Sequence, residues 1–308
     1  MVDSQKWIVI VNPIAGSGAG LEKYPLISRR LRDEGIIHEP IFTEHKFHAV
    51  ELTVSAIVQG YRKLLVVGGD GTIHEVVNGL FIQKVVDPAE VTIGVVAVGD
   101  INNWAKSSRI PLNIDKAVEV IKRGNTALQD VGTVTYEEAH YRQTRYFVVA
   151  AGLGFNTYAL KRINHLRNKG RGRLRLIWSF VRSFFKYKPT GIKIWIDDEL
   201  VWNDLLMSLA IGVGDYGAGG MRQMPHAVMD DGELDLSLFR PIHFWHIIFR
   251  TRHLFNGGIY RIGHILQQRG AKIRIQSTPE IALEADGELL GESPLEFGIL
   301  QKAIRVVR

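Results

Sequence analysis

The first third of the chain alternates between short apolar runs and longer amphipathic segments. The apolar runs predict buried strands at 7–11, 39–43, 63–67 and 92–97. The amphipathic segments predict helices at 21–34, 49–59, 73–81 and 114–123, the last of which ends at Gly124. Strands that alternate with helices indicate a parallel sheet covered by helices, in which ligands bind at the carboxyl ends of the strands.

The rest of the chain is dominated by alternating or continuous apolar runs that are typical of strands. We predict strands at 126–135, 145–150, 192–197, 205–213, 234–239, 272–276, 280–285 and 303–308. Helical insertions are expected near 158–185 and 241–255. The change of pattern near residue 130 divides the chain into two predicted domains, 1–128 and 129–294. The fold class is therefore an α/β domain, with a parallel sheet and flanking helices, followed by a mostly β domain.

The turn after the third predicted strand carries the strongest chemical signal. It reads Gly68-Gly69-Asp70-Gly71-Thr72 and opens into an amphipathic helix. Glycines let main-chain amides approach a ligand closely, and a helix N-terminus favours an anion such as a phosphate. Asp70 would then act through a bound Mg²⁺ or accept a proton from a hydroxyl, which is the chemistry of a kinase. The alternative is an ordinary turn, in which Thr72 and Glu75 form a capping box.

A second glycine-rich loop follows the first predicted strand. Residues 12–20 read Asn-Pro-Ile-Ala-Gly-Ser-Gly-Ala-Gly, and the Lys-Ser/Thr pair that ends a P-loop is missing. A dinucleotide-binding turn is an open alternative, with Glu39 or Glu44 reaching a ribose. In either interpretation the small residues permit close approach to phosphates.

These two loops, in this order, resemble the nucleotide-binding signatures of the diacylglycerol kinase catalytic family, which includes bacterial lipid kinases and is related to sphingosine and ceramide kinases. The resemblance implies ATP and Mg²⁺ as cofactors and a lipid substrate bound in a cleft between the domains. It also implies a sandwich-like second domain and a last strand, at about 295–308, that returns to the first domain. The residues that it assigns to the nucleotide are Asn12, Pro13, Gly16, Ser17, Gly18, Thr43, Gly68, Gly69, Asp70, Gly71, Thr72, Glu75, Gly99 and Asp100.

Two stretches depart from the family pattern. In 97–105, where the family reads Pro-x-Gly-Thr-x-Asn-Asp, Asp100 replaces the threonine and Asn103 replaces the aspartate. A carboxylate that faces phosphates costs Coulomb energy unless a metal ion or Lys106 compensates it. The alternative is a shifted loop whose side chains face solvent. In 152–157, which resembles a Gly-Phe-Asp-Ala element near the acceptor site, Asn156 replaces the aspartate.

An Asp-Gly turn at 228–235 would ordinarily do no more than precede a strand. The resemblance gives it a structural Mg²⁺. The ligands that it implies are the side chain of Asp231 and the carbonyls of Val228 and Glu233, which are oxygen donors of the kind that a hard cation prefers.

A second Asp-Gly turn, at 284–288, is a plausible hairpin that matches the Asp-Gly-Glu element of the family. The resemblance implies that Glu288 is the base that takes the proton from the acceptor hydroxyl, with Asp286 as the next choice. Each would be brought near Asp70 across the cleft. Phosphoryl transfer relies chiefly on positioning and on charge stabilisation, so a weak carboxylate base is adequate.

Positive charge is concentrated in the middle of the chain. The formal net charge is +6, and no acidic residue occurs between Glu138 and Asp197, where Lys and Arg are frequent. Within this stretch, 174–185 predicts a basic amphipathic helix that lies on an anionic membrane surface. The alternative is a helix that covers the β domain while its arginines reach solvent. No nucleic-acid partner is expected, because no binding motif accompanies the charge.

The absence of cysteine excludes disulfides and thiol catalysis and is compatible with a reducing compartment. The start of the chain lacks the pattern of a secretion signal, and no apolar run approaches the roughly 18–20 residues of a membrane span. The predicted location is the cytoplasm, with peripheral contact at the inner face of the membrane. The oligomeric state is open, and a homodimer is one alternative.

The predicted function is ATP-dependent transfer of the γ-phosphoryl group to a hydroxyl of diacylglycerol or a related lipid. Two alternatives are open. One is a kinase of the NAD kinase type, which shares Gly-Gly-Asp-Gly but uses a soluble acceptor. The other is a catalytically weakened lipid-binding or regulatory protein, which Asp100, Asn103 and Asn156 motivate.

Overall fold

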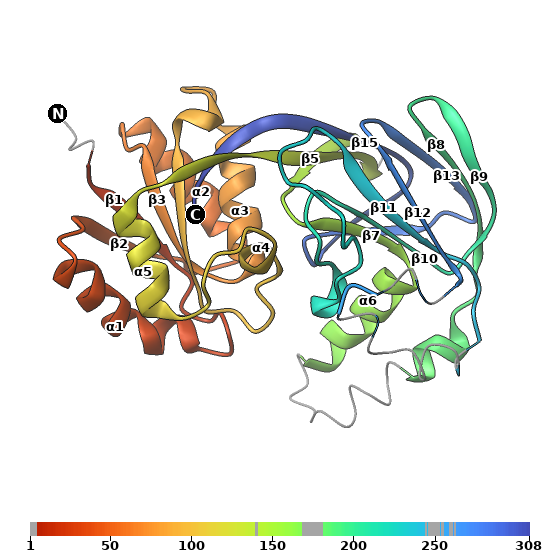
Figure 1. Cartoon of the computed structure of the whole chain (residues 1–308), viewed down its shortest axis with the longest axis horizontal. Coiled ribbons are helices and arrows are strands. Elements are labelled where there is room, and N and C mark those ends of the chain that lie inside the picture. The colour runs from red at the N-terminus through yellow and green to blue at the C-terminus, as the bar shows by residue number, and fades with distance from the viewer. Residues whose placement is uncertain are drawn as a thin grey trace.

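The computed structural model describes residues 5–138, 141–167, 181–243, 245, 253, 256–258, 261 and 263–308. The chain forms two lobes that lie side by side, an α/β lobe from the first part of the sequence and a lobe made mostly of strands (Figure 1). The predicted fold class is confirmed.

The first lobe is built on a parallel sheet of four strands in the order β4-β3-β1-β2. These strands are β1 (Trp7–Val11), β2 (His38–Phe42), β3 (Lys63–Gly68) and β4 (Thr92–Ala97). The helices are α1 (Ala19–Asp33), α2 (His48–Val58), α3 (Asp70–Ile82), α4 (Asn103–Ser107) and α5 (Ile114–Arg123), with a 3₁₀ turn η1 (Pro88–Glu90). All four predicted strands and the four longer helices are confirmed, with ends that differ by a few residues.

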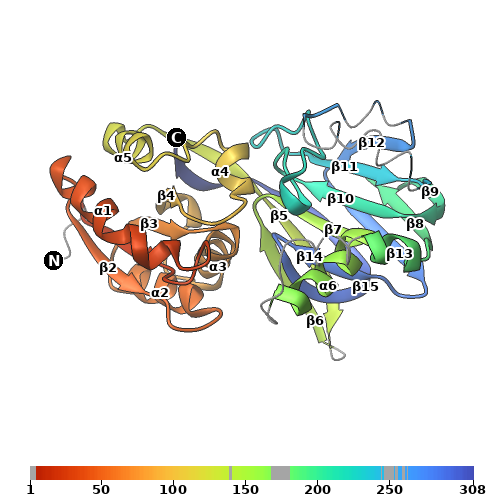
Figure 2. The ribbon, with the colours of Figure 1, turned by 90° about the horizontal axis from the view of Figure 1, so that it is seen from below.

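Alternation of side chains along each strand gives this sheet two apolar faces. In β1, Ile8 and Ile10 join the cluster that includes residues of α2 and α3, whereas Val9 and Val11 join the cluster that includes residues of α1 and α5. Figure 2 shows α5 and α3 on opposite sides of β3 and β4. Burial on both faces explains why these strands are continuous apolar runs.

The second lobe consists mainly of antiparallel strands, of which β5 and β15 are the longest. They are β5 (Thr126–Glu138), β6 (Tyr141–Phe147), β7 (Ala150–Gly154), β8 (Thr190–Ile196), β9 (Glu199–Leu206), β10 (Ser208–Gly212), β11 (Leu234–Phe239), β12 (Ile265–Gly270), β13 (Ile273–Thr278), β14 (Ala282–Ala285) and β15 (Glu288–Val307). Helix α6 (Phe155–Arg167), a helical turn at 181–186 and a 3₁₀ turn η2 (Ala218–Gly220) accompany them. Most of the predicted insertion at 241–255, and residues 168–180 of the other, lie outside the described residues.

Two predicted strands in this lobe are wrong, because each apolar run contains a break. The run 145–150 divides between β6 and β7, since the amides of Val148 and Val149 bind the Asp286 carboxylate instead of a neighbouring strand. The run 205–213 divides between β9 and β10 at Met207, whose amide and carbonyl bind Phe239 and Phe155. Residues 199–204 of β9 and the whole of β12 are strands that the sequence pattern did not predict.

Strands β5 and β15 connect the lobes. They pair antiparallel over most of their length, and the end of β15 also pairs parallel with β4, where Arg305 is opposite Thr92. The two ribbons cross from one lobe to the other at the top of Figure 1. Strand β5 runs through the predicted boundary between residues 128 and 129, and the domain limits stay a prediction.

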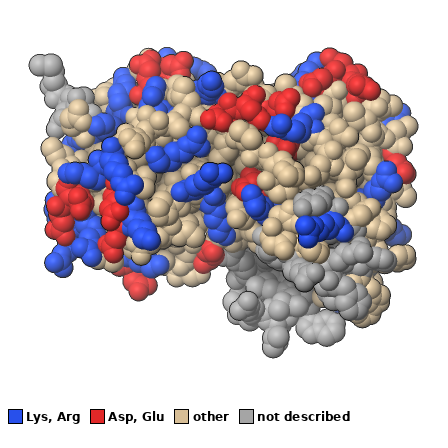
Figure 3. Space-filling view, in the orientation of Figure 1, with Lys and Arg blue, Asp and Glu red and all other residues tan. Residues whose placement is uncertain are grey.

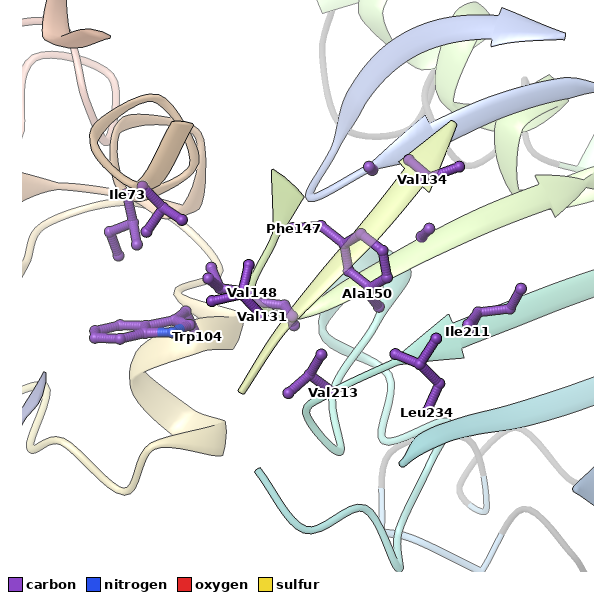
Figure 4. Packing of buried hydrophobic residues seen from close by; sticks show 14 of the residues in the cluster. Ile73, Trp104, Val131, Val134, Phe147, Val148, Ala150, Ile211, Val213 and Leu234 are labelled. Atoms are coloured by element: carbon purple, nitrogen blue, oxygen red, sulfur yellow. The ribbon is translucent and has the colours of Figure 1, made fainter. Parts of the chain in front are cut away.

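An apolar cluster makes up a large part of the contact between the lobes. Trp104 from α4 and Ile73 from α3 belong to the same buried cluster as Val131, Phe147 and Val148 of the second lobe (Figure 4). On α3, Phe81 also stacks on Tyr146 with ring centroids 4.2 Å apart. A continuous core of this kind holds the two lobes in a fixed arrangement.

Candidate functional site

A cavity of about 260 Å³ lies where the two lobes meet. The first lobe contributes the turn after β3 and the loop after β4. The second lobe contributes the starts of β7 and α6, the loop before η2 and the turn between β14 and β15. The residues that line it are Gly69, Asp70, Gly99, Asp100, Ile101, Asn102, Asn103, Val149, Ala150, Asn156, Leu160, Gly217, Gly219, Glu284, Asp286 and Gly287.

Asp70 is held at the first position of α3 by the backbone of α4. Its carboxylate accepts hydrogen bonds from the amides of Asn103, at 2.9 Å, and Trp104, at 3.0 Å. Burial raises the pKa of Asp70, and these two hydrogen bonds oppose the rise. Gly69 and Gly99 bring the two loops together, because a Cβ on Gly99 would lie 2.7 Å from the Gly69 Cα. Asp70 therefore has one fixed orientation in the cavity wall.

The first glycine-rich loop is tied to the start of α3. Asn12 donates from Nδ2 to Thr72 Oγ1 at 2.9 Å, and its own Oδ1 accepts from the amide of Ile14 at 3.1 Å. Thr43, at the end of β2, donates its amide to Val11 at 2.9 Å. The ends of β1, β2 and β3 are thus joined at one edge of the sheet, as the sequence predicts for ligand-binding turns.

The predicted nucleotide residues fall into two groups. Gly69, Asp70, Gly99 and Asp100 line the cavity itself. The others belong to the loops and strand ends beside it, and they are Asn12, Pro13, Gly16, Ser17, Gly18, Thr43, Gly68, Gly71, Thr72 and Glu75. Their contact with a nucleotide stays a prediction.

Glu75 caps the start of helix α2, a role that the sequence did not indicate. Its two carboxylate oxygens accept the amides of Phe47, at 3.0 Å, and Ala49, at 3.1 Å, at the start of α2. Burial raises the pKa of Glu75, and these hydrogen bonds oppose the rise. The alternative of a capping box between Thr72 and Glu75 is wrong, because α3 begins at Asp70 and Glu75 caps a neighbouring helix instead.

Asp286 is the most constrained acidic group at the site. Its side chain is 1% exposed, and its oxygens accept the amides of Val148, Val149 and Ala150 at 3.0–3.1 Å. Oδ2 also lies 3.1 Å from Nδ1 of His74 on α3. With this many partners, Asp286 positions the β14–β15 turn against α3.

Glu288 lies beside the start of α3, next to the residues of the β14–β15 turn that line the cavity. It forms an ion pair with Lys46, and its Oε1 lies 4.0 Å from the position that a Cβ on Gly71 would take. The structure therefore brings the turn that carries Glu288 and Asp286 to the start of the helix that carries Asp70. Their chemical roles stay predictions.

Sequence reasoning missed Glu284. This side chain lines the cavity, and burial raises its pKa to about 7, against the effect of the Gly287 amide that it accepts at 2.9 Å. Asp286 and Glu288 raise the pKa further by repulsion. Space for the carboxyl comes from Gly152, where a Cβ would lie 2.5 Å from Oε1. The available signal was a glutamate between Leu283 and Ala285 in an apolar strand, directly before the Asp-Gly-Glu element.

Two residues that depart from the family pattern, Asn103 and Asn156, line the cavity together with Asn102. Asn102 Oδ1, Asn103 Oδ1 and Asn156 Nδ2 are buried and have no hydrogen-bond partner within the described part of the chain. Buried polar atoms are usually paired, so these three atoms suit a polar ligand. The alternative of solvent-facing side chains does not hold for Asn103, whose Nδ2 donates to the carbonyl of Gly217 at 2.9 Å.

The oxygen atoms around Asp70 fit a hard divalent cation. Besides the Asp70 carboxylate, the same wall presents Asp100 and the unpaired Oδ1 atoms of Asn102 and Asn103. Mg²⁺ prefers oxygen ligands of this kind and is usually held by one or two carboxylates together with substrate phosphates.

The loop at 228–235 does not fit the predicted Mg²⁺ site. One oxygen of Asp231 pairs with Arg269, and the other accepts the amide of Glu233 at 3.1 Å. The Glu233 carboxylate is also 3.2 Å from Arg269. Burial raises the pKa of the adjacent Asp235 to about 6, although Arg269 opposes the rise. The guanidinium of Arg269 therefore already supplies a positive charge to the carboxylates of this loop.

Comparison with known proteins places this two-lobed chain, with its cavity at the junction, among proteins of the kinase type. The diacylglycerol kinase catalytic domain matches residues 6–134, and the YegS C-terminal NAD kinase beta sandwich-like domain matches residues 148–308. The chain belongs to the family of diacylglycerol kinase catalytic domains that carry this second domain.

Its relatives are similar over nearly their whole length. A protein named putative lipid kinase YtlR, from Bacillus subtilis, is 26% identical over 97% of this chain and 98% of its own. A diacylglycerol kinase from Staphylococcus carnosus is 25% identical over 97% and 93%.

Solved structures share the fold. A putative diacylglycerol kinase from Bacillus anthracis superposes with a TM-score of 0.77 at 21% identity, over 98% of this chain and 97% of that one. Yeast NADH kinase has a TM-score of 0.56 at 12% identity, over 99% and 84%. Across the residues that the structure describes, no helix combines the length and apolar character needed to cross a membrane.

Proposed function

We propose that this chain is an ATP-dependent lipid kinase, which transfers the γ-phosphoryl group to a hydroxyl of diacylglycerol or a related lipid. The observation that carries the proposal is the cavity at the junction of the lobes. Its first-lobe wall has the Gly69-Asp70 turn and its second-lobe wall has the acidic turn before β15. Family membership supports the assignment.

The first-lobe wall suits the phosphates of a nucleotide. Helix α3 begins at Asp70, and its N-cap, Gly69, supplies no side-chain hydrogen bond to the first turn. Amides at an uncapped helix start attract anions. Asp70, Asp100 and Asn103 would hold a Mg²⁺ ion, which when bound neutralises charge on the phosphates.

The second-lobe wall suits the acceptor. Glu288 is the proposed base, since it lies beside the start of α3 while Asp286 is fully occupied by its hydrogen bonds. In the transfer, the acceptor O–H bond breaks and Glu288 takes the proton. The acceptor oxygen bonds to the γ-phosphorus, and the bond from phosphorus to ADP breaks.

A lipid acceptor implies contact with a membrane surface, which we propose to be anionic and cytoplasmic. Most of the predicted basic amphipathic segment at 174–185 lies outside the described residues. Within the described part, Phe185 is 68% exposed and Trp245 is 64% exposed on the second lobe. Elsewhere, on the face drawn in Figure 3, basic side chains lie among acidic ones on both lobes.

The test is an assay of the purified chain with Mg²⁺ and ATP, using diacylglycerol, ceramide and sphingosine in mixed micelles and NAD in solution. We expect phosphorylated lipid, with loss of turnover in Asp70→Asn. The matched control is Asp87→Asn, because Asp87 is exposed and caps η1 away from the cavity. Phosphorylation of NAD alone would contradict the proposal in favour of a soluble acceptor. Lipid binding without metal-dependent turnover would contradict it in favour of a regulatory protein.

A further inference from the structure

Arg269, on β12, faces a row of carboxylates on β11 and on the loop that leads into it. Asp235 lies on β11, whereas Asp231 and Glu233 lie in the bend just before it, on either side of Gly232 with φ of 81°. In the β11–β12 pairing, Asp235 and Arg269 are directly opposite each other. The strand register brings Arg269 to Asp235, and the bend brings the other two carboxylates to the same guanidinium.

The three nitrogens of the guanidinium each take a different partner. Nη2 binds Asp231, Nη1 lies 3.2 Å from Glu233 Oε2, and Nε lies 3.3 Å from Asp235 Oδ1. Arginine suits this task because it carries five N–H donors in a rigid plane and keeps its charge at any physiological pH. A divalent ion in the same place would have to coordinate the carboxylate oxygens that now bind Arg269.

The loop that Arg269 holds is attached to the strands that connect the lobes. Buried Asp130 of β5 accepts the amide of Gly232 at 2.7 Å and that of Lys302 of β15 at 2.6 Å. The amide of Asp130 donates to the carbonyl of Met229 at 2.8 Å. Fixing the loop therefore also fixes the place where β5 and β15 pass between the lobes.

The same loop reaches the cavity through α4. The hydroxyl of Ser108, the C-cap of α4, lies 3.8 Å from the sulfur of Met229. The other end of α4 supplies the amides that hold Asp70. A change in the conformation of the 228–235 loop would therefore affect α4, whose first residues hold Asp70.

We infer that the guanidinium of Arg269 is the resident cation of the 228–235 loop and takes the place of the structural Mg²⁺ that the family resemblance implies there. The loop of this chain consequently keeps its conformation without a divalent metal. The inference concerns stability and holds whether or not the chain phosphorylates a lipid.

The experiment is thermal unfolding of the full chain without nucleotide, in excess EDTA and in millimolar Mg²⁺. We expect the Tm of the wild type to differ by less than about 1 °C between the two conditions. Arg269→Met removes the charge and keeps an apolar stem, and we expect its Tm in EDTA to fall by roughly 3–8 °C. Mg²⁺ should then raise the Tm of Arg269→Met, because the carboxylates are free to bind it.

Two further variants make the result specific. Arg308→Met is the matched control, since Arg308 makes a single 3.6 Å pair with Asp230 of the same loop, and its Tm should stay near that of the wild type. Adding Asp231→Asn to Arg269→Met should abolish the effect of Mg²⁺, which excludes binding at Asp70 as its source. If Arg269→Met does not fold, Arg269→Lys, which keeps the charge, should fold and remain insensitive to Mg²⁺.

Three results would overturn the inference. One is a wild-type Tm that rises with Mg²⁺ and loses this rise in Asp231→Asn. Another is an Arg269→Met variant as stable in EDTA as the wild type. The third is an unstable Arg269→Met variant that Mg²⁺ does not stabilise, because the arginine would then not be interchangeable with a metal ion.

Discussion

Asp70 and Asp231 each precede a glycine in a turn close to the junction of the lobes, yet their surroundings differ. Two main-chain amides meet the Asp70 carboxylate, and the turn opens onto a cavity. The Asp231 carboxylate instead forms an ion pair with the side chain of Arg269, and Asp231 does not line this cavity. Amide dipoles orient a carboxylate without cancelling its charge, so Asp70 remains able to bind a cation, whereas a full positive charge satisfies Asp231.

Exchanging each aspartate for asparagine gives the largest expected difference between the two turns. Asp70→Asn should lower kcat on the order of 10²–10³-fold, because a fixed charge at the reaction centre is lost. Asp231→Asn should change kcat far less, since that group faces Arg269 and not the cavity. Initial rates in the lipid assay measure both, with circular dichroism to establish folding. Equal losses in the two variants would contradict the comparison.

Asp286 extends the comparison to an aspartate whose carboxylate is held by three main-chain amides and is almost entirely buried. Asp286→Asn replaces one of the two accepting oxygens by an NH2 donor, which leaves at least one of the three main-chain amides facing another donor. It also removes the charge, and we expect it to lower the free energy of unfolding by roughly 4 kcal/mol. Urea unfolding measures the change. Glu292→Gln, at an exposed position of β15, is the control and should behave as the wild type. A stable Asp286→Asn variant would show that the three hydrogen bonds are not the main support of this turn.

Glu284 accepts one main-chain amide, whereas Asp70 accepts two and Asp286 accepts three. Its pKa is raised to about 7 in the folded chain from an ordinary value of 4.5, so between these values the folded state holds a proton that the unfolded state has lost. Stability from this group is complete below pH 4.5, falls as the pH rises toward 7, and is constant above. The fall should be roughly 3 kcal/mol.

Glu284→Gln should remove that pH dependence, because the amide does not titrate. Urea unfolding at intervals between pH 4.5 and 8 measures it in both proteins. An unchanged slope in Glu284→Gln would assign the titration to another group.

The smallest effect is expected at the ion pair of Lys46 and Glu288, whose side chains are 59% and 27% exposed. Exposed pairs contribute little to stability, so Lys46→Met should change the free energy of unfolding by less than about 1 kcal/mol. Chemical denaturation is again the measurement. A larger loss would mean that Lys46 holds the β14–β15 turn against α3.

The sequence predicted the first lobe well because its signals are local. Apolar runs that are buried on both faces, amphipathic helices and a glycine C-cap such as Gly124, with φ of 67°, each depend on neighbours in the chain. The position of Asp70 at a strand-to-helix turn is local in the same sense.

What the sequence did not show depends on pairing between distant segments. Arg269 meets Asp235 only through the register of β11 and β12, and Asp286 is held by amides more than 130 residues earlier in the chain. The burial of Glu284 likewise depends on Gly152 across the β7–β14 pair. No periodicity within one segment contains such information.

The pairing of β15 with β4 has a consequence for the order of folding during synthesis. The sheet of the first lobe has β4 as its margin until residues 305 and 306 arrive beside it. Once residues up to 134 have left the ribosome, β4 pairs with β3 on one side and has an unpaired edge on the other, and that edge is covered only when residues 305 and 306 have been synthesised. Nascent chains of this protein should therefore depend on chaperones until that segment has emerged.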